Sequence, residues 1–467
     1  MAPSKLDMLF LQEETPSSYN LTTPKKGNHR DGDTYYSPHY HHVTVSGLHP
    51  ATTYYYKPVV HQEVEQFQKY NLRTSYAAHP SAGKYSQAFQ VSEKASSQDP
   101  GIEVRQRHRH LNLPPYDGSE KECPSPDKIR SFKTAPPPGY ESVNLAIMGD
   151  IGQFPHSEDT IARMIRSKKD IDLLILAGDV AYTGTDHRRW DTFFDFLDDY
   201  PITERIPMQV VPGNHDIDKE DQGNEIFLAY EHRFRMPRVQ PAQLGVYDGP
   251  PGPLNMDQPP YPLSYEWGNA YYSFTYGPAR VIMISSYSSM EPNSTQYKWI
   301  SSELEKVDRS VTPWLLAVLH TPIYNTFSLH QKDKQIIAAK EHLEPLFVKH
   351  KVNLVFSGHI HAYLRTTNVI MDEVDPTGPV HITIGAGGRK CEAPFKNAEP
   401  EQWVEVRDAT IYGYGMFRIL NRTTAEWDWI HTGHTDDRDY NQLWKSNDTL
   451  PSGPGSDHVF ISNQYYP

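Results

Sequence analysis

The sequence predicts an α/β fold, and three observations support this prediction. Five short apolar runs follow one another after Gly139, and runs of this length without alternation are typical of strands buried on both faces. The stretches between the runs carry apolar residues at helical spacing, as at Ile161, Met164 and Ile165. Each run ends in a polar residue. Because ligands bind beyond the carboxyl ends of the strands in such sheets, we expect the functional site there.

The predicted elements alternate along the chain. The five strands are expected in NLAIMGD, DLLILAGD, IPMQVVPGNHD, WLLAVLH and VNLVFSGH. Two further helices are indicated by apolar residues at Trp190, Phe193, Phe194 and Leu197, and at Leu343, Leu346 and Phe347. Three later β-rich stretches, HITIGAG, YGYGMFRIL and AEWDWIHT, are expected to complete the sheet, the last two joined by a turn at NRTT.

A separate β domain is expected at the N-terminus. Residues 40–60 contain two β-rich stretches and residues 131–135 a closing strand. The interval 61–130 is polar and lacks periodicity of either two or 3.6, so it is interpreted as a long loop or insertion. The sequence is therefore expected to divide into an N-terminal domain over 1–138, with an incomplete start as one interpretation, a main domain over 139–435, and an irregular tail over 436–467.

Composition excludes several classes of function. The 467 residues include 45 basic and 58 acidic side chains, for a net charge of -13, which opposes broad binding to nucleic acid or anionic membrane. No run approaches the ~18 apolar residues that span a bilayer, and the first residues show no signal-peptide core. The two cysteines, Cys123 and Cys391, could pair or stay free. Glycosylation sequons begin at Asn20, Asn293, Asn421 and Asn447.

The polar residues at the strand ends form a pattern typical of a metal site. Asp150 and Asp179 close the first two strands, and each follows a glycine that lets the backbone turn sharply. The next three strands end in oxygen and imidazole donors, which are Asn214-His215-Asp216, His320 and His359-Ile360-His361. The i, i+2 spacing of the last two histidines places both side chains on one side of an extended segment. Such ligands suit iron, manganese or zinc.

These motifs resemble the ordered motif set of the metallophosphoesterases and, within them, of the purple acid phosphatases. The resemblance covers residues 140–430. The five motifs are Gly149-Asp150-Ile151-Gly152, Gly178-Asp179-Val180-Ala181-Tyr182, Gly213-Asn214-His215-Asp216, His320 in AVLH, where Ala317 replaces the usual valine, and Gly358-His359-Ile360-His361. The subfamily rests on Tyr182 and on Gly152, which stands where related phosphodiesterases have a histidine. A phenol becomes a good ligand when a strongly polarising ion such as Fe(III) displaces its proton.

The resemblance implies a fold, a reaction and a set of roles. The fold would be a four-layer αββα sandwich after a partial fibronectin type III-like β-sandwich. The reaction would be hydrolysis of phosphate monoesters in acid by a metal-bound hydroxide at an Fe(III)–M(II) centre, with M being zinc, manganese or iron. Asp150, Tyr182 and His361 would hold the ferric ion, Asn214, His320 and His359 the divalent ion, and Asp179 would bridge them. His215 and His330 would donate protons to the phosphate or to the leaving oxygen.

Alternatives remain open at this point. A related enzyme could cleave diesters or nucleotide pyrophosphates at a similar pair of metals, and a non-catalytic protein could keep the fold and bind phosphate. The family resemblance implies a secreted glycoprotein acting on small phosphorylated substrates. The natural substrate, the divalent metal and the oligomeric state are not determined by the sequence.

Overall fold

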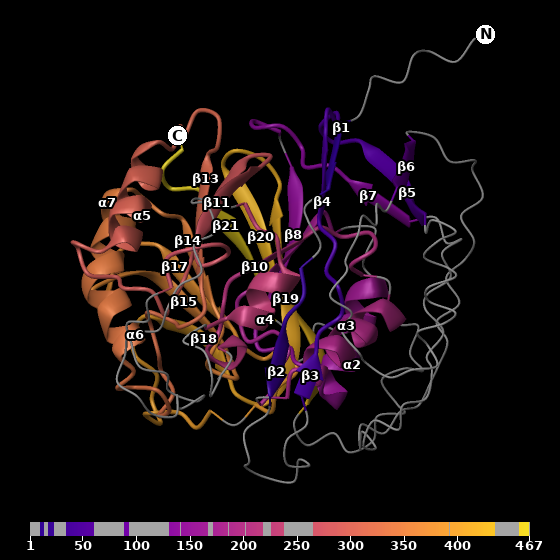
Figure 1. Cartoon of the computed structure of the whole chain (residues 1–467). Coiled ribbons are helices and arrows are strands. Elements are labelled where there is room, and N and C mark those ends of the chain that lie inside the picture. The colour runs from indigo at the N-terminus through magenta and orange to yellow at the C-terminus, as the bar shows by residue number, and fades with distance from the viewer. Residues whose placement is uncertain are drawn as a thin grey trace.

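The computed structural model describes residues 10–13, 17–22, 34–59, 88–92, 130–140, 142–166, 171–184, 186–200, 202–217, 226–237, 265–391, 393–434 and 457–466. Within these ranges two large β-sheets face each other, and helices cover the outer face of each (Figure 1). The predicted α/β fold with four layers in the order αββα is confirmed.

The first sheet has six strands. Its order is β10 (Met208–Val210), β9 (Leu173–Leu176), β8 (Val143–Met148), β19 (Ile411–Ile419), β20 (Thr424–His434) and β21 (Asp457–Ser462). The first three strands are parallel to one another, whereas β19, β20 and β21 add in antiparallel fashion. The expected hairpin between YGYGMFRIL and AEWDWIHT is therefore present.

The second sheet is built around four parallel strands. These are β12 (Ala279–Ile284), β13 (Trp314–Leu319), β14 (Leu354–Ser357) and β17 (Val380–Ile384). Antiparallel strands extend it at both ends, namely β11 (Tyr272–Tyr276), β15 (Tyr363–Ile370), β16 (Glu373–Val374) and β18 (Val404–Asp408). The five apolar runs of the sequence are thus divided between two sheets, three in the first and two in the second.

Helices cover the outer face of each sheet, and three of these segments contain the predicted apolar positions, at Ile161, Trp190 and Leu343. α2 (Pro155–Arg166) and α3 (Arg188–Asp199) lie on the first sheet, with the short α4 (Leu228–Arg233) near them. The second sheet is covered by α5 (Thr295–Glu305) and by a continuous helical segment made of α6 (Lys334–Ala338), a π-helical turn (Ala339–Leu343) and α7 (Glu344–Lys349). Figure 1 shows α5, α6 and α7 on the left and α2 and α3 on the right of the two sheets.

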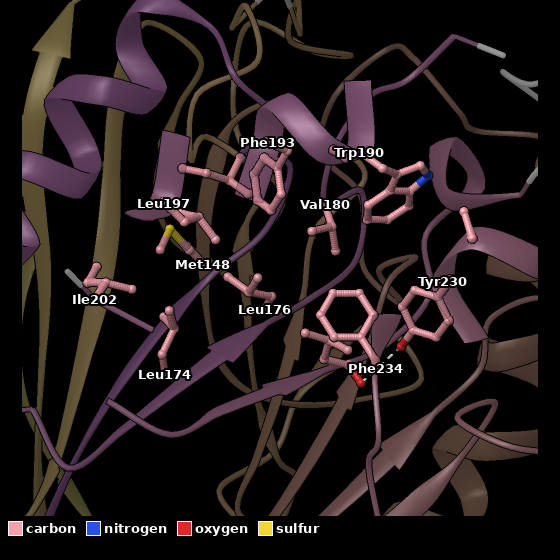
Figure 2. Close-up of a cluster of buried hydrophobic side chains, with 14 of the residues drawn as sticks. Met148, Leu174, Leu176, Val180, Trp190, Phe193, Leu197, Ile202, Tyr230 and Phe234 are labelled. Atoms are coloured by element: carbon pink, nitrogen blue, oxygen red, sulfur yellow. Dashed lines mark hydrogen bonds between the residues drawn. The ribbon is translucent and has the colours of Figure 1, made fainter. Parts of the chain in front are cut away.

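Three apolar cores hold these four layers together. One core lies between α3 and the first sheet, where Trp190, Phe193 and Leu197 of the helix pack over Leu174 and Leu176 of β9 (Figure 2). A second core fills the space between the sheets and a third lies beneath α5, α6 and α7. Because β9 and β13 are buried on both faces, their sequences are continuous apolar runs rather than alternating ones.

The expected N-terminal β region is present among the described residues. β4 (Val43–Ser46) pairs with β1 (Phe10–Glu13), and β2 (Asn20–Thr22) pairs with β3 (Thr34–Tyr36). β5 (Thr53–Val59) pairs with the predicted closing strand β7 (Arg130–Lys133).

One part of the predicted insertion over 61–130 is wrong. Ala88–Ser92 forms a strand, β6, which pairs with β5. Its five residues, AFQVS, are too few to stand out as a β pattern within a polar interval. The remainder of the interval up to Ile129 lies outside the described residues.

The prediction of an irregular tail over 436–467 is also wrong in part. Residues 457–462 form β21 at the edge of the first sheet, where they pair with β20. An edge strand buries only alternate residues, and β21 follows that pattern after its buried first residue, Asp457. Val459 and Ile461 are half-buried between exposed neighbours, so the signal is weaker than that of the central strands.

The described residues give partial information on the other sequence features. Asn293 and Asn421 are both exposed, whereas Asn447 and the side chain of Asn20 lie outside the described part. Cys391 is buried, and Cys123 lies outside that part, so their pairing stays open. Among the described residues, no helix combines the length and the apolar character needed to cross a membrane.

A buried ion pair links the two sheets and generates a prediction on stability. The Asp457 carboxylate of β21 accepts hydrogen bonds from the Tyr363 hydroxyl at 2.6 Å and from the Arg365 guanidinium at 2.5 and 3.0 Å, both on β15. Asp457→Ala should lower the free energy of unfolding by about 3 kcal/mol, since it leaves the Arg365 charge buried and unpaired. Urea unfolding followed by tryptophan fluorescence measures this change.

The matched control is Lys306→Ala, which removes an exposed ammonium group from its ion pair with Glu303. An exposed pair contributes less than about 1 kcal/mol. Equal unfolding midpoints for the two variants would show that the Asp457 pair does not hold the sheets together.

Candidate metal centre

The carboxyl ends of both sheets meet at one place, and seven predicted residues lie there. Asp150 follows β8 by two residues, Asp179 and Tyr182 follow β9, and Asn214 opens a 3₁₀ turn after β10. His320 directly follows β13, and His359 and His361 follow β14. The polar ends of strands from two different sheets therefore form one site.

One group of donor atoms surrounds the Tyr182 phenol. Its hydroxyl oxygen lies 3.0 Å from Oδ1 of Asp150, to which it donates, and 3.0 Å from Nε2 of His361. The ligand atoms of Asp150, Asp179 and His361 all lie within 4.8 Å of one another. Two carboxylates, a phenol and an imidazole thus share one small volume.

A second group surrounds the Asn214 carboxamide. Its Oδ1 lies 3.1 Å from Nε2 of His320 and 3.0 Å from Nδ1 of His359. Nε2 of His320 is also 3.4 Å from Oδ1 of Asp179. Asp179 therefore lies between the two groups and reaches both.

Hydrogen bonds on the far side of each ring determine what these histidines offer. Nδ1 of His320 lies 2.7 Å from the Ala177 carbonyl, which can only accept, so this nitrogen carries the proton. Nε2 of a neutral His320 then directs a lone pair at the Asn214 and Asp179 oxygens. Nε2 of His359 is 3.1 Å from the Asp333 carboxylate, which leaves its Nδ1 lone pair directed at Asn214. Converging lone pairs without protons between them are the arrangement that a cation stabilises.

The electrostatics of the site agree with this conclusion. Burial raises the pKa of Asp179, but the charges that His320 and His215 can carry and the His215 backbone N–H bring it down to about 2. Burial lowers the pKa of His359 to about 4, so its ring is neutral at neutral pH. Burial and the Asp150 and Asp179 carboxylates raise the pKa of Tyr182 well above its ordinary value. Only a strongly polarising cation could replace the phenol proton here.

The backbone is strained at the same positions. Four of the seven residues have positive φ angles, which are 57° at Asp150, 54° at Asp179, 52° at Tyr182 and 69° at His359. Each such residue costs on the order of 1–3 kcal/mol and persists where the surrounding structure imposes it. Strain of this kind gathers at functional sites.

Two motif glycines are required by the closeness of the donors. A Cβ atom on Gly213 would lie 2.1 Å from Oδ1 of Asp179, and one on Gly358 would lie 2.4 Å from Oδ2 of Asp150. Any side chain at these positions would displace a carboxylate. The glycine in each motif is therefore part of the site.

The two predicted proton donors flank the centre. The His215 ring lies 4.5 Å from that of Tyr182, with its Nε2 4.0 Å from Oδ2 of Asp179. The His330 ring lies 4.2 Å from that of His359 on the other side. Both side chains are 21–24% exposed, so each faces solvent as well as the centre.

Sequence reasoning missed Asp333. Its Oδ2 accepts hydrogen bonds from Nδ1 of His330 at 2.8 Å and from Nε2 of His359 at 3.1 Å. Burial raises the pKa of Asp333, yet these two histidines bring it below its ordinary value. The carboxylate thus orients one ring of the centre and one ring beside it. The i, i+3 spacing from His330 was the available signal.

Asp216, the last residue of the Gly213-Asn214-His215-Asp216 motif, holds two loops together. Its carboxylate accepts from the backbone N–H of Val180 at 2.9 Å and of Gly213 at 2.9 Å. It therefore fixes the loop of Asp179 against the loop of Asn214.

Comparisons with known proteins agree with this geometry. Residues 143–363 match the family model of the calcineurin-like phosphoesterases, and residues 378–439 match the model described as iron/zinc purple acid phosphatase-like protein C. The chain is 34% identical over 309 residues to probable purple acid phosphatase 20 of Arabidopsis thaliana, with 66% of each chain covered. It is 31% identical over 337 residues to purple acid phosphatase 22 of the same plant, with 70% of each covered.

A solved structure shows the same fold. The purple acid phosphatase PPD1 from yellow lupin (Lupinus luteus) seeds superposes with a TM-score of 0.61 at 18% identity, covering 97% of this chain and 69% of that one.

The alignments with the two Arabidopsis relatives span about two thirds of the length of each relative. The two family models, the similarity to these relatives and the tyrosine at the strand-end site agree, and the chain belongs to the purple acid phosphatases, within the calcineurin-like phosphoesterases.

Proposed function

We propose that this protein is an acid phosphatase that hydrolyses phosphate monoesters at a centre of two metal ions, one ferric and one divalent. The observation that carries the proposal is the pair of donor groups that share Asp179, one around the Tyr182 phenol and one around the Asn214 carboxamide. Two adjacent donor sets with one carboxylate between them are suited to two ions.

Each ion would have its own ligands. Asp150, Tyr182 and His361 would hold Fe(III), since a phenol beside two carboxylates calls for the more strongly polarising ion. Asn214, His320 and His359 would hold zinc, manganese or divalent iron, which accept neutral nitrogen and oxygen donors. Asp179 would bridge the two. When bound, such ions neutralise phosphate oxygens and supply hydroxide at acid pH.

The chain's own residues would then position the ester and move protons. The His215 and His330 imidazoles flank the centre and reach solvent, so both can contact a phosphate group there. A protonated imidazole can donate a hydrogen bond to a phosphate oxygen or a proton to the leaving oxygen. Asp333 would hold the His330 ring in its orientation through the 2.8 Å hydrogen bond.

We also propose a substrate class and a location for the enzyme. The substrates would be small phosphorylated molecules, and the protein would be a secreted glycoprotein. Exposure of Asn293 and Asn421 supports this, because oligosaccharide transfer requires an accessible sequon.

The first test is an assay at pH 5 with p-nitrophenyl phosphate and bis(p-nitrophenyl) phosphate. Faster hydrolysis of the monoester is expected. Preference for the diester would favour a phosphodiesterase of the same family. Phosphate binding in equilibrium dialysis without turnover would favour a binding protein.

Two substitutions separate metal binding from proton transfer. Asp179→Asn should lose bound metal and about 1,000-fold in kcat, because both donor groups share this carboxylate. His215→Ala should keep its metal and lose about 100-fold in kcat with a poor leaving group, as expected of a general acid. Metal analysis and steady-state kinetics measure both effects. A fully active Asp179→Asn enzyme would contradict the metal assignment.

Tyr182 can be tested by colour. Protein purified without chelators should be purple, because tyrosinate bound to Fe(III) gives a broad charge-transfer band in the visible range. Tyr182→Phe should abolish this band, whereas Tyr287→Phe, which loses only a 3.2 Å hydrogen bond to Asn214, should keep it. An active, metal-loaded and colourless wild-type protein would exclude Tyr182 as a ferric ligand.

Asp333 should affect metal retention through His359. Asp333→Asn weakens the acceptor that holds the ring, and loss of such a partner typically lowers metal affinity 10–100-fold. Competition with a chelator, followed by metal analysis, measures this effect. The control is Asp375→Asn, in the turn directly after β16, where the side chain is only partly buried. Unchanged retention in Asp333→Asn would show that Asp333 does not act through His359.

A further inference from the structure

A loop after β17 lies tightly against the backbone of Asp150. The Gly387 N–H donates to the Gly149 carbonyl at 3.1 Å, and the Arg389 N–H donates to the Asp150 carbonyl at 3.0 Å. A Cβ atom on Gly388 would lie 2.2 Å from Oγ of Ser157, so the loop packs closely against α2 and leaves no room for a side chain there. The Arg389 backbone is therefore fixed directly beside the metal centre.

The Arg389 side chain extends over the aromatic rings next to this centre. Its Cζ lies 5.1 Å from the ring centre of Phe154 and 5.7 Å from that of Tyr182. The residue is exposed, whereas Tyr182 is buried. Within the part of the chain that the structure describes, the guanidinium has no carboxylate or hydrogen-bond acceptor. Its donors are available to a ligand.

A second arginine adds positive charge to the same region. Arg189 lies at the start of α3, and its carbonyl accepts a 2.8 Å hydrogen bond from Gln153, which also contacts the Ala181 carbonyl. Nε of Arg189 is buried and has no hydrogen-bond partner among the described residues. Burial lowers the pKa of Arg189, Asp186 raises it, and the Arg389 charge lowers it further. The two guanidinium groups therefore repel each other.

Three other arginines among the described residues are paired with carboxylates. Arg365 binds Asp457, Arg233 binds Asp191 and Arg280 binds Glu303, with N···O distances of 2.5–2.7 Å. The Asp186 carboxylate, which could serve Arg189, already accepts two hydrogen bonds from Arg188. An arginine pair without its own acceptor is a suitable site for an anion of more than one charge.

We propose that Arg389, supported by Arg189, forms a subsite for a second phosphate group of the substrate. This inference rests on the proposed phosphatase activity and adds the substrate class, which is a phosphate monoester with a further phosphate group. The transferred phosphate would lie at the metal centre and the second one against the guanidinium beyond the Tyr182 ring. On a chain with a net charge of -13, such a local positive site opposes the general repulsion of polyanions.

The test compares two substrates that differ by one phosphate group. Fructose 1,6-bisphosphate and fructose 6-phosphate are assayed with the metal-loaded wild type and with Arg389→Gln, and kcat/KM is taken for each. A charged hydrogen bond is worth enough to change binding about tenfold or more. The preference for the bisphosphate, expressed as the ratio of the two kcat/KM values, should therefore fall about tenfold in Arg389→Gln. Arg389→Lys, which keeps the positive charge, should retain part of the preference for the bisphosphate.

The control is Arg166→Gln, which removes one exposed positive charge at the far end of α2 and should leave the ratio at the wild-type value. An arginine that only covers Tyr182 would lower both kcat/KM values together and leave the ratio unchanged, and that result would overturn the subsite. A ratio that falls equally in both Gln variants would also overturn it, since net charge alone would explain the preference. A wild type that hydrolyses neither substrate nor p-nitrophenyl phosphate would instead overturn the phosphatase proposal on which the subsite rests.

Discussion

The strand ends of this protein are arranged around one electrostatic constraint. The lone pairs of several donor side chains point toward one small region beside the Asp179 carboxylate. Three imidazole nitrogens, a carboxamide oxygen, two carboxylates and a phenol lie in two groups that share Asp179, with neighbouring atoms 3.0–3.4 Å apart and too few protons to separate them. Without a cation or protons between them, these acceptor atoms would repel one another. The strained φ angles of four of these residues show that the surrounding fold imposes the arrangement.

The αββα architecture explains how the fold can impose it. β8, β9 and β10 bring Asp150, Asp179 and Asn214 from one sheet, and β13 and β14 bring the histidines from the other. The core between the sheets holds these strand ends opposite each other. Glycines at the closest approaches leave room for the carboxylates, so side-chain position is set by rigid strands and short loops rather than by long, adaptable segments.

Around this acidic centre lies a ring of groups that can carry positive charge. His215 and His330 flank it, Asp333 orients His330 from behind, and Arg389 extends over the Tyr182 ring. A phosphate ester would thus meet donors on several sides. The negative net charge of the whole chain makes this local contrast the main electrostatic guide for an anionic substrate.

The sequence by itself determined the α/β class, the five buried strands and the seven donors at the strand ends, because each of these depends on local order. Apolar runs, helical spacing and a glycine before an aspartate can be read along the chain. The tertiary structure decided what depends on contacts between distant segments. It divided the five strands between two sheets, added β6 and β21 through pairing with stronger strands, and brought Asp333 and Arg389 to the centre. Asp333 and Arg389 contact His359, Phe154 and Tyr182, and such contacts between separate segments of the chain leave no periodic trace in the sequence.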